Sequence, residues 1–309
     1  MDAKIKEIGQ RALEKIYKLL YGTGIGKIPG VSDAFVKLAN ILYGAVEMDG
    51  QKLKYDSSFG IHGMLKIIRG EYEPEVTSLF CSLIRKGMTI FDIGAGVGYY
   101  TLLAAKRVGD DGLVVAFEPN PRLFELLVEN VKINGWKNVK VIQSAVSDMC
   151  TKVLLNIPRV GSSGSSISPT VSDKRIVVKS ISLDEFLQQH EDVSEIDLIK
   201  MDIEGGEVRA IKGMKEVIKK FKPIIICEIH SKQINAIGDN IRDINNILFT
   251  NNYEKFLILN HKLVKSEIKE SSGRHYLFIH QEKIKNLKVL KEKVRNMRAS
   301  FPLALPWKI

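Results

Sequence analysis

From Met88 onward, short apolar runs alternate with amphipathic stretches, and this alternation predicts a parallel β-sheet flanked by helices. A last apolar run at 276–279 is expected to close the sheet as an antiparallel edge strand. The pattern therefore predicts an α/β fold, a doubly wound and mostly parallel sheet of about seven strands over residues 72–281. The other expected strands are 89–93, 114–117, 139–142, 196–201, 223–229 and 253–259, and the first two expected helices are 99–107 and 121–134.

Two segments interrupt or precede this pattern. Possible strands near 153–157 and 176–180 surround a Gly/Ser-rich loop at 161–168, which we expect to be mobile. Residues 1–71 are predicted to form a helical cap or arm over the main domain. Their apolar residues recur at helical spacing from Ile5 to Leu20, and a second apolar helix is expected at about 32–45.

The net charge of +10 is concentrated at one end of the chain. Residues 282–309 contain eight Lys or Arg against two Glu, together with an apolar stripe that begins at Ile284. We interpret this segment as a basic amphipathic tail. Such a helix can lie on an anionic membrane surface or pack on the main domain, and both interpretations remain open.

Composition favours a cytoplasmic protein, with membrane association through the tail as the alternative. No apolar run reaches the length of about 18 residues that a membrane-spanning helix needs, and the first residues lack the apolar stretch of a secretory signal. Cys81, Cys150 and Cys227 lie far apart, so we expect reduced thiols and no metal site.

The first predicted strand runs into a glycine-rich turn, Phe91-Asp-Ile-Gly-Ala-Gly-Val-Gly-Tyr-Tyr-Thr101, that opens a helix. Gly94, Gly96 and Gly98 allow a tight turn and a close approach of the backbone to a ligand. Glu118 ends the next strand, where its carboxylate can accept both hydroxyls of a ribose. The sequence therefore predicts a nucleoside site.

The spacing of the turn distinguishes between two nucleoside cofactors. Dinucleotide sites usually have GxGxxG, with a pyrophosphate at the helix N-terminus, whereas here the spacing is GxGxG and Asp92 precedes it. A carboxylate there repels pyrophosphate but suits the ammonium group of a methionine. This favours S-adenosylmethionine over a nicotinamide dinucleotide. The small residues Ser144, Ala145 and Val146 after the third strand leave room for the adenine base.

Acid–base groups end the next two strands. Asp202 and Glu204 lie in the segment Lys-Met-Asp-Ile-Glu-Gly-Gly-Glu at 200–207, and Glu228 and His230 share one face of the following strand. Carboxyl ends of parallel strands meet at one edge of the sheet. The convergence indicates deprotonation of an acceptor hydroxyl.

At these motifs the sequence resembles the FkbM family of S-adenosylmethionine-dependent methyltransferases. The resemblance covers about 160 residues, includes Tyr72-Glu-Pro-Glu75 and Glu118-Pro-Asn120, and departs from the family at Gly96, where Asn is common. It implies O-methylation of a hydroxyl on a sugar, glycan or secondary metabolite.

The resemblance and the strand positions together assign roles to particular residues. His230 is expected to act as the base, oriented by Glu228 or Glu204, with Asp202 near the methionine end of the cofactor. The expected cofactor-binding residues are Tyr72, Glu73, Asp92, Gly94, Ala95, Gly96, Gly98, Tyr99, Tyr100, Thr101, Glu118, Pro119, Asn120, Ser144, Ala145, Val146 and Asp202.

Two other functions stay open at this point. A tRNA or rRNA methyltransferase is one, because a helix with Glu129, Asn130 and Asn134 after such a loop also occurs in tRNA guanine methyltransferases, and the basic tail would contact phosphates. Against it, the fourth strand lacks an Asn-Pro-Pro-aromatic motif. A non-catalytic peripheral membrane or scaffold protein is the other. We expect a small-molecule or glycan acceptor rather than nucleic acid.

Overall fold

The computed structural model describes residues 45–55, 69–157, 174–269 and 272–284, together with short stretches and single positions at 9, 11–13, 15–16, 34, 38, 41, 63 and 66–67. The positions between 9 and 16 and those at 34, 38 and 41 are helical, as predicted. The Gly/Ser-rich loop at 161–168, the tail beyond Ile284 and most of the two predicted N-terminal helices lie outside the described residues.

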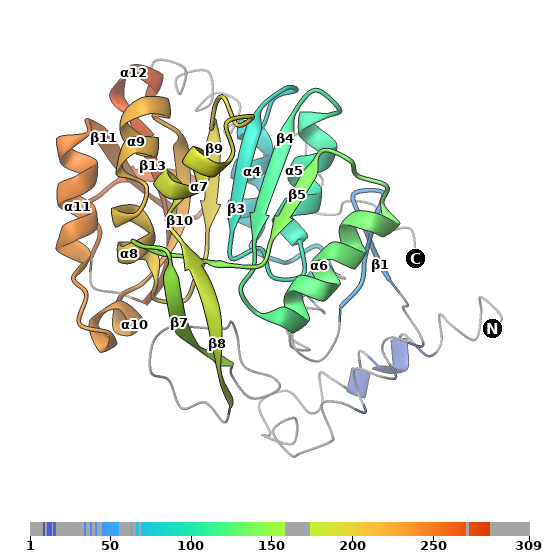
Figure 1. Cartoon of the computed structure of the whole chain (residues 1–309). Helices are drawn as coiled ribbons and strands as arrows, with labels where there is room; N and C mark the ends of the chain where they lie inside the picture. The colour runs from blue at the N-terminus through green and yellow to red at the C-terminus, as the bar shows by residue number, and fades with distance from the viewer. Residues whose placement is uncertain are drawn as a thin grey trace.

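The main sheet is mixed and has eight strands in the order β12-β11-β13-β10-β9-β3-β4-β5 (Figure 1). The five strands from β5 to β10 pair in parallel, and β13 and β12 pair antiparallel to their neighbours. The strands are β3 (Thr89–Ile93), β4 (Leu113–Phe117), β5 (Val139–Ile142), β9 (Leu198–Met201), β10 (Ile224–His230), β11 (Tyr253–Leu259), β12 (Lys262–Lys265) and β13 (Ser272–His280).

This confirms the predicted α/β fold, with two differences in the sheet. A short strand, β12, forms a hairpin with β11 and brings the number to eight. The last strand, β13, lies between β10 and β11 and not at the edge. The reason is visible in its four consecutive apolar residues, 276–279, which are all fully buried. Such a strand has apolar contacts on both faces, which an edge position would leave partly in water.

Helices cover both faces of the sheet. Because alternate residues of a strand point to opposite faces, the strands contribute to two separate apolar clusters. One cluster includes side chains of α4, α5 and α6, and the other includes side chains of α7, α8, α9, α10 and α11. The helices are α4 (Pro74–Leu83), α5 (Tyr99–Val108), α6 (Pro121–Ile133), α7 (Leu183–Gln189), α8 (Glu207–Lys212), α9 (Lys215–Phe221), α10 (Ser231–Ala236), α11 (Ile241–Thr250) and α12 (Gln281–Ile284).

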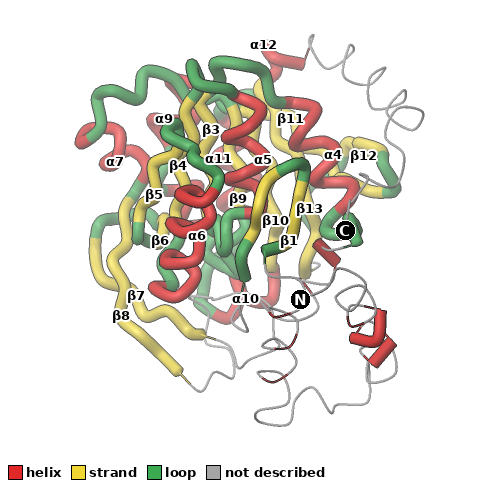
Figure 2. Tube along the Cα trace, turned by 90° about the vertical axis from the view of Figure 1, so that its right-hand side faces the viewer, coloured by secondary structure: helices red, strands yellow, loops and turns green. Residues whose placement is uncertain are grey.

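The segment inserted after β5 forms a small second sheet in the order β6-β8-β7. Its strands are β6 (Ala145–Val146), β7 (Thr151–Ile157) and β8 (Lys174–Ile181). The two predicted strands near 153–157 and 176–180 are therefore confirmed as an antiparallel pair. This pair extends away from the main sheet beside α6 (Figure 2).

A β-hairpin precedes the main domain, in a segment predicted as helices and loops. Strands β1 (Val46–Met48) and β2 (Gln51–Leu53) meet at Asp49-Gly50, whose φ angles of 51° and 73° are typical of a tight hairpin turn. Val46, Met48 and Leu53 are buried in the same apolar cluster as α5. This hairpin is therefore part of the core of the main domain.

Helix α6 holds the hairpin through its asparagines. The Asn130 side chain accepts from the Lys54 amide at 2.6 Å and donates to the carbonyl oxygens of Lys54 and Val97, each at 2.8 Å. Asn134 accepts from the Lys52 amide at 2.8 Å and donates to the Lys52 carbonyl at 2.7 Å. Glu129 forms an ion pair with Lys54. The three residues that suggested an RNA methyltransferase helix therefore have a structural role here.

The turn after β3 passes close to the end of β9. Gly94 has a φ of 81°, and a Cβ at this position would lie 1.9 Å from the carbonyl oxygen of Asp202. Only glycine allows this approach without moving Asp202. The contact fixes the distance between the glycine-rich turn and residues 202–207, the DIEGGE segment.

Replacing Asn130 by Ala is expected to lower the free energy of unfolding by about 2–4 kcal/mol, because the partly buried backbone groups of Lys54 and the buried carbonyl of Val97 lose their partners. Asn134→Ala is the matched control, since Asn134 makes the same kind of contact from a partly exposed position, and its expected cost is about 1 kcal/mol. Urea unfolding followed by circular dichroism measures both. Equal losses would contradict the account of the hairpin.

Gly94→Ala is expected to destabilise the protein more than Gly87→Ala. The two glycines have nearly equal φ angles of 81° and 79°, but a Cβ at Gly87 would meet nothing within 4 Å. The backbone strain alone predicts about 1–2 kcal/mol for Gly87→Ala, and the clash with Asp202 adds to it at Gly94. Thermal and urea unfolding of the two variants measures the loss of stability in each. Equal losses for Gly94→Ala and Gly87→Ala would contradict the close contact with Asp202.

Candidate active site

Glu118 directly follows β4 and accepts hydrogen bonds from the backbone of the turn after β3 and of the turn after β4. One carboxylate oxygen accepts from the Gly96 amide and the other from the Asn120 amide, each at 2.8 Å. The side chain is buried, and burial raises its pKa to about 7, against these two hydrogen bonds, which lower it. Each oxygen keeps a lone pair for a further donor.

Asp92 is the second buried carboxyl group of the glycine-rich turn. The hydroxyl of Thr101, in the first turn of α5, donates to Asp92 at 2.6 Å. Burial raises the pKa of Asp92 to about 6, although the Thr101 bond and the Lys200 ammonium oppose the rise. The sequence motif therefore folds as expected, with Asp92 and Glu118 at the ends of neighbouring strands.

The remaining residues expected to bind a cofactor lie in the segments that follow β3, β4 and β5. Ala95 donates its amide to the Phe117 carbonyl at 3.0 Å, and Asn120 caps α6 by accepting from the Arg122 amide at 3.0 Å. Ser144, Ala145 and Val146 are buried where the chain leaves β5 and enters β6. Gly98 precedes α5, and Pro119 follows Glu118 at a partly exposed position.

The segment before α4 reaches the start of α5. The Tyr100 hydroxyl donates to Glu73 at 2.6 Å, and the rings of Tyr72 and Tyr99 lie 4.8 Å apart between centroids. Glu73 has a φ of 41°, a left-handed conformation that turns its side chain towards the sheet. Tyr72 and Glu73 therefore contact the first turn of α5, and their binding of a cofactor stays a prediction.

Three carboxylates surround His230 at the end of β10. Its Nδ1 lies 2.8 Å from Glu207, and its Nε2 lies 3.3 Å from Glu204 and 3.4 Å from Glu228. Burial lowers the pKa of His230, but Glu207 and Glu228 outweigh burial and raise the pKa to about 11. The ring then carries both protons at neutral pH. It has no lone pair for a substrate proton, so the role of base expected from the sequence does not fit this arrangement.

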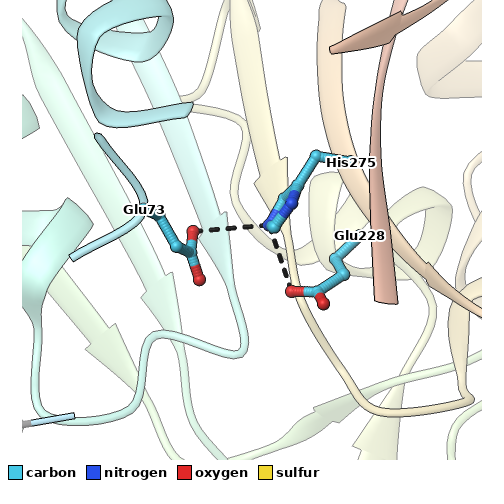
Figure 3. Close-up of side chains that lie close together, drawn as sticks. All are labelled: Glu73, Glu228 and His275. Atoms are coloured by element: carbon cyan, nitrogen blue, oxygen red, sulfur yellow. Dashed lines mark ion pairs between the residues drawn. The ribbon is translucent and has the colours of Figure 1, made fainter. Parts of the chain in front are cut away.

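A second histidine, His275, joins the cluster from β13 (Figure 3). Its Nε2 lies 3.1 Å from Glu228 and 3.4 Å from Glu73. Burial lowers the pKa of His275, and the two carboxylates outweigh burial and raise it to about 9. Glu228 lies between two imidazolium rings, which hold its pKa well below the usual range despite burial.

His275 and Glu207 are not among the site residues that the sequence predicts. His275 belongs to no motif and reaches the site only because β13 pairs with β10 in the register that places His275 opposite Glu228. Glu207 lies in the quoted motif but follows the strand end, at the first residue of α8. Its contact with the Nδ1 atom of His230 is seen only in the folded structure.

Lys200 provides the fixed positive charge of the cluster. The side chain is 1% exposed, its ammonium nitrogen lies 4.0 Å from Asp202, and it stands 4.7 Å from the centroid of the Tyr100 ring. Burial raises the pKa of Asp202 to about 8, and Lys200 limits that rise. The Asp202 side chain is 27% exposed, so it is the more accessible of the two.

By geometry alone, parts of the cluster resemble cation sites. The ligand atoms of Glu73, Glu228 and His275, and those of Asp202, Glu228 and His230, lie within 4.8 Å of one another. Both histidines carry protons in this arrangement, and the Lys200 ammonium stands beside Asp202. A divalent cation would have to displace those protons and face that ammonium, so the absence of a metal stays a prediction.

Comparisons with known proteins find relatives that are methyltransferases by name. The chain is 25% identical to the hexuronic acid methyltransferase AglP of Haloferax volcanii over 167 residues, which are 54% of this chain and 65% of AglP. It is 38% identical over 71 residues to protein-L-isoaspartate O-methyltransferase 1 of Archaeoglobus fulgidus, 22% of this chain and 33% of that protein. The chain thus spans less than two thirds of either relative.

A solved FkbM methyltransferase from Methylobacillus flagellatus is 16% identical, with a TM-score of 0.42 over 73% of this chain and 56% of that one. Residues 92–255, more than half of the chain, match the family model described as the methyltransferase FkbM domain. This match covers the glycine-rich turn, Glu118 and the DIEGGE segment, and S-adenosylmethionine is the cofactor of such a domain. The chain therefore belongs to the FkbM methyltransferase domain family.

Proposed function

We propose that this protein is an S-adenosylmethionine-dependent methyltransferase that acts on a hydroxyl group of a sugar or glycan. The observation that carries the proposal is that two half-sites adjoin. The glycine-rich turn with Asp92 and Glu118 ends β3 and β4, and the ionic cluster ends β9 and β10 next to them. The contact from Tyr100 to Glu73 joins the two. The name of the H. volcanii relative, a hexuronic acid methyltransferase, supports a sugar acceptor.

The residues of the first half-site fit S-adenosylmethionine. Glu118 has lone pairs for the ribose hydroxyls, and the buried residues 144–146 would face the adenine. Asp92 contributes negative charge near the sulfonium and ammonium groups. Gly96, with a φ of 57° and open space at its Cβ position, has a conformation that Asn also tolerates. The departure from the family at this position therefore leaves the backbone of the turn intact.

When bound, S-adenosylmethionine supplies an electrophilic methyl group. The chain's part is then to place an acceptor oxygen in line, to exclude water and to take up the hydroxyl proton. The carboxylates of Glu204 and Glu228 can accept hydrogen bonds from neighbouring hydroxyls of a sugar. His230 acts in this arrangement as a cationic donor that orients Glu204 and Glu228.

The alternatives receive less support from the described residues. Glu129, Asn130 and Asn134 hold the β1–β2 hairpin against α6, which gives them a structural role. The basic tail, on which the predictions of membrane association and of RNA phosphate contacts depend, lies outside the described residues. Within the described part of the chain, helices are all too short or too polar to span a bilayer.

A direct test of the proposal is transfer of labelled methyl groups from S-adenosylmethionine. We expect incorporation into sugar or glycan acceptors and none into transfer RNA or ribosomal RNA. Methylation of RNA alone would overturn the acceptor class while leaving the family unchanged. No transfer to any acceptor, with intact binding of S-adenosylhomocysteine, would favour a non-catalytic role.

Binding of S-adenosylhomocysteine is expected to weaken about 10- to 100-fold in Glu118→Gln, because a charge-assisted hydrogen bond to ribose is lost. The control is Asp111→Asn, at an exposed turn. Since the pKa of Glu118 is about 7, wild-type affinity should also rise up to about tenfold between pH 6 and pH 8 as Glu118 loses its proton. Calorimetric titration measures both. A pH dependence that persists unchanged in Glu118→Gln would contradict this role.

A further inference from the structure

The Lys200 ammonium is buried without a hydrogen-bond acceptor. The side chain is 1% exposed, and within the described ranges its nitrogen has no hydrogen-bond partner. The nearest carboxylate, that of Asp202, is 4.0 Å away, beyond hydrogen-bond distance. A buried ammonium with three unused donors is costly unless another group supplies the missing acceptor.

The surroundings keep this group protonated. Burial lowers the pKa of Lys200, but the carboxylates of Asp202, Glu73, Glu228 and Asp92 outweigh burial and raise it. These four carboxylates come from the residue after β9, the turn before α4, β10 and β3. The Tyr100 ring covers the ammonium from α5. Lys200 therefore offers hydrogen bonds inside a region where six carboxyl groups (Glu73, Asp92, Asp202, Glu204, Glu207 and Glu228) outnumber three cations (Lys200, His230 and His275).

These charges restrict the chemistry of a bound group. A carboxylate or phosphate would satisfy Lys200 but would be repelled by the surrounding carboxylates. A metal cation would be repelled by Lys200. A neutral hydroxyl satisfies both, because its oxygen accepts from an ammonium and its proton is donated to a carboxylate. The most accessible carboxylate beside Lys200 is that of Asp202.

We propose that the reacting hydroxyl of the acceptor binds between the Lys200 ammonium and the Asp202 carboxylate, and that this acceptor is a neutral sugar and not a uronic acid. The inference rests on the proposed methyltransferase function and names its acceptor class. Lys200 donates a hydrogen bond to the hydroxyl oxygen, and Asp202 accepts the hydroxyl proton. Asp202 directly follows β9, two residues after Lys200, and its carboxylate lies 4.0 Å from the Lys200 ammonium nitrogen.

The step balances without any further reactant. The hydroxyl O–H bond breaks and its proton passes to Asp202. The oxygen forms a bond to the methyl carbon as the carbon–sulfur bond breaks, and that electron pair stays on sulfur, which becomes a neutral thioether. Lys200 keeps its proton and stabilises the negative charge that develops on the oxygen. Lys200 and Asp202 are then catalytic residues.

The first experiment compares neutral and acidic acceptors. Wild-type protein receives labelled S-adenosylmethionine and matched p-nitrophenyl hexosides and hexuronides of the gluco and galacto series. The expected result is transfer to hexosides at least about tenfold faster than to hexuronides, because the carboxylates of the cluster repel a second anion. Faster transfer to hexuronides would overturn the proposal. No transfer to either set would instead overturn the sugar methyltransferase function itself.

The second experiment replaces Lys200 by Met, with Lys219→Met on the exposed face of α9 as the matched control. Lys200→Met is expected to lower kcat about 100- to 1000-fold, the size of effect seen on removing a donor to a developing oxyanion. The affinity for S-adenosylhomocysteine should stay within about threefold of wild type. Lys200→Arg, which keeps the charge and guards against a folding defect, should retain part of the activity.

The dependence of rate on pH separates a catalytic from a structural role. The wild-type rate should rise with pH through about 8, as Asp202 loses its proton among Lys200, Glu228, Glu73 and His230. The rise should move to higher pH in Lys200→Met, because the lowering effect of the ammonium is gone, and should vanish in Asp202→Asn. An unshifted profile with normal kcat in Lys200→Met would overturn the proposal.

A final measurement distinguishes the acceptor from the methionine carboxylate of the cofactor as the partner of Lys200. Both S-adenosylhomocysteine and 5′-methylthioadenosine, which lacks the amino-acid part, are titrated into Lys200→Met. Equal small effects on both ligands support the acceptor site. A loss of affinity confined to S-adenosylhomocysteine would assign Lys200 to the cofactor and overturn the proposal.

Discussion

The burial of one ammonium among carboxylates from four separate elements organises this site. Lys200 stands within the field of four carboxyl groups, which lie just after β9 (Asp202), in the turn before α4 (Glu73), in β10 (Glu228) and in β3 (Asp92). Each of these carboxyl groups loses solvation on burial, and the ammonium offsets part of that loss for Glu73, Asp92 and Asp202. The positions of the elements and the ionisation of the site therefore depend on each other.

The fold explains why these charges meet. The chain passes from β3 outward to β4 and β5, and it then crosses to the other side of β3 to form β9 and β10. A crevice opens at such a reversal of strand order, outside the carboxyl ends of the strands. The close contact between Gly94 and Asp202 holds the turn after β3 against the end of β9. His275 joins the ionic cluster from β13, and Glu73 joins it from the segment before α4.

Local patterns predicted the parts of the fold that they directly encode. The strands, the glycine-rich turn and Glu118 follow from apolar runs and from spacing, and they are where the sequence places them. The position of β13 and the role of His275 depend on long-range pairing with β10, which no local pattern contains. The β1–β2 hairpin had a local signal in Asp49-Gly50. Its strands are only three residues each and directly follow a segment with helical spacing, so the apolar pattern did not distinguish them. The protonation of His230 depends on Glu207 and Glu228 together, so residue type alone suggested a base.

The central claim is that the cofactor crevice and the ionic cluster form one site. A crystal structure of the protein with bound S-adenosylhomocysteine tests this most directly. The account predicts ribose hydroxyls bonded to Glu118, adenine beside residues 144–146, and the sulfur facing the side of the crevice that carries Lys200 and Asp202. An adenosine group bound away from Glu118, or a sulfur directed away from β9, would contradict it.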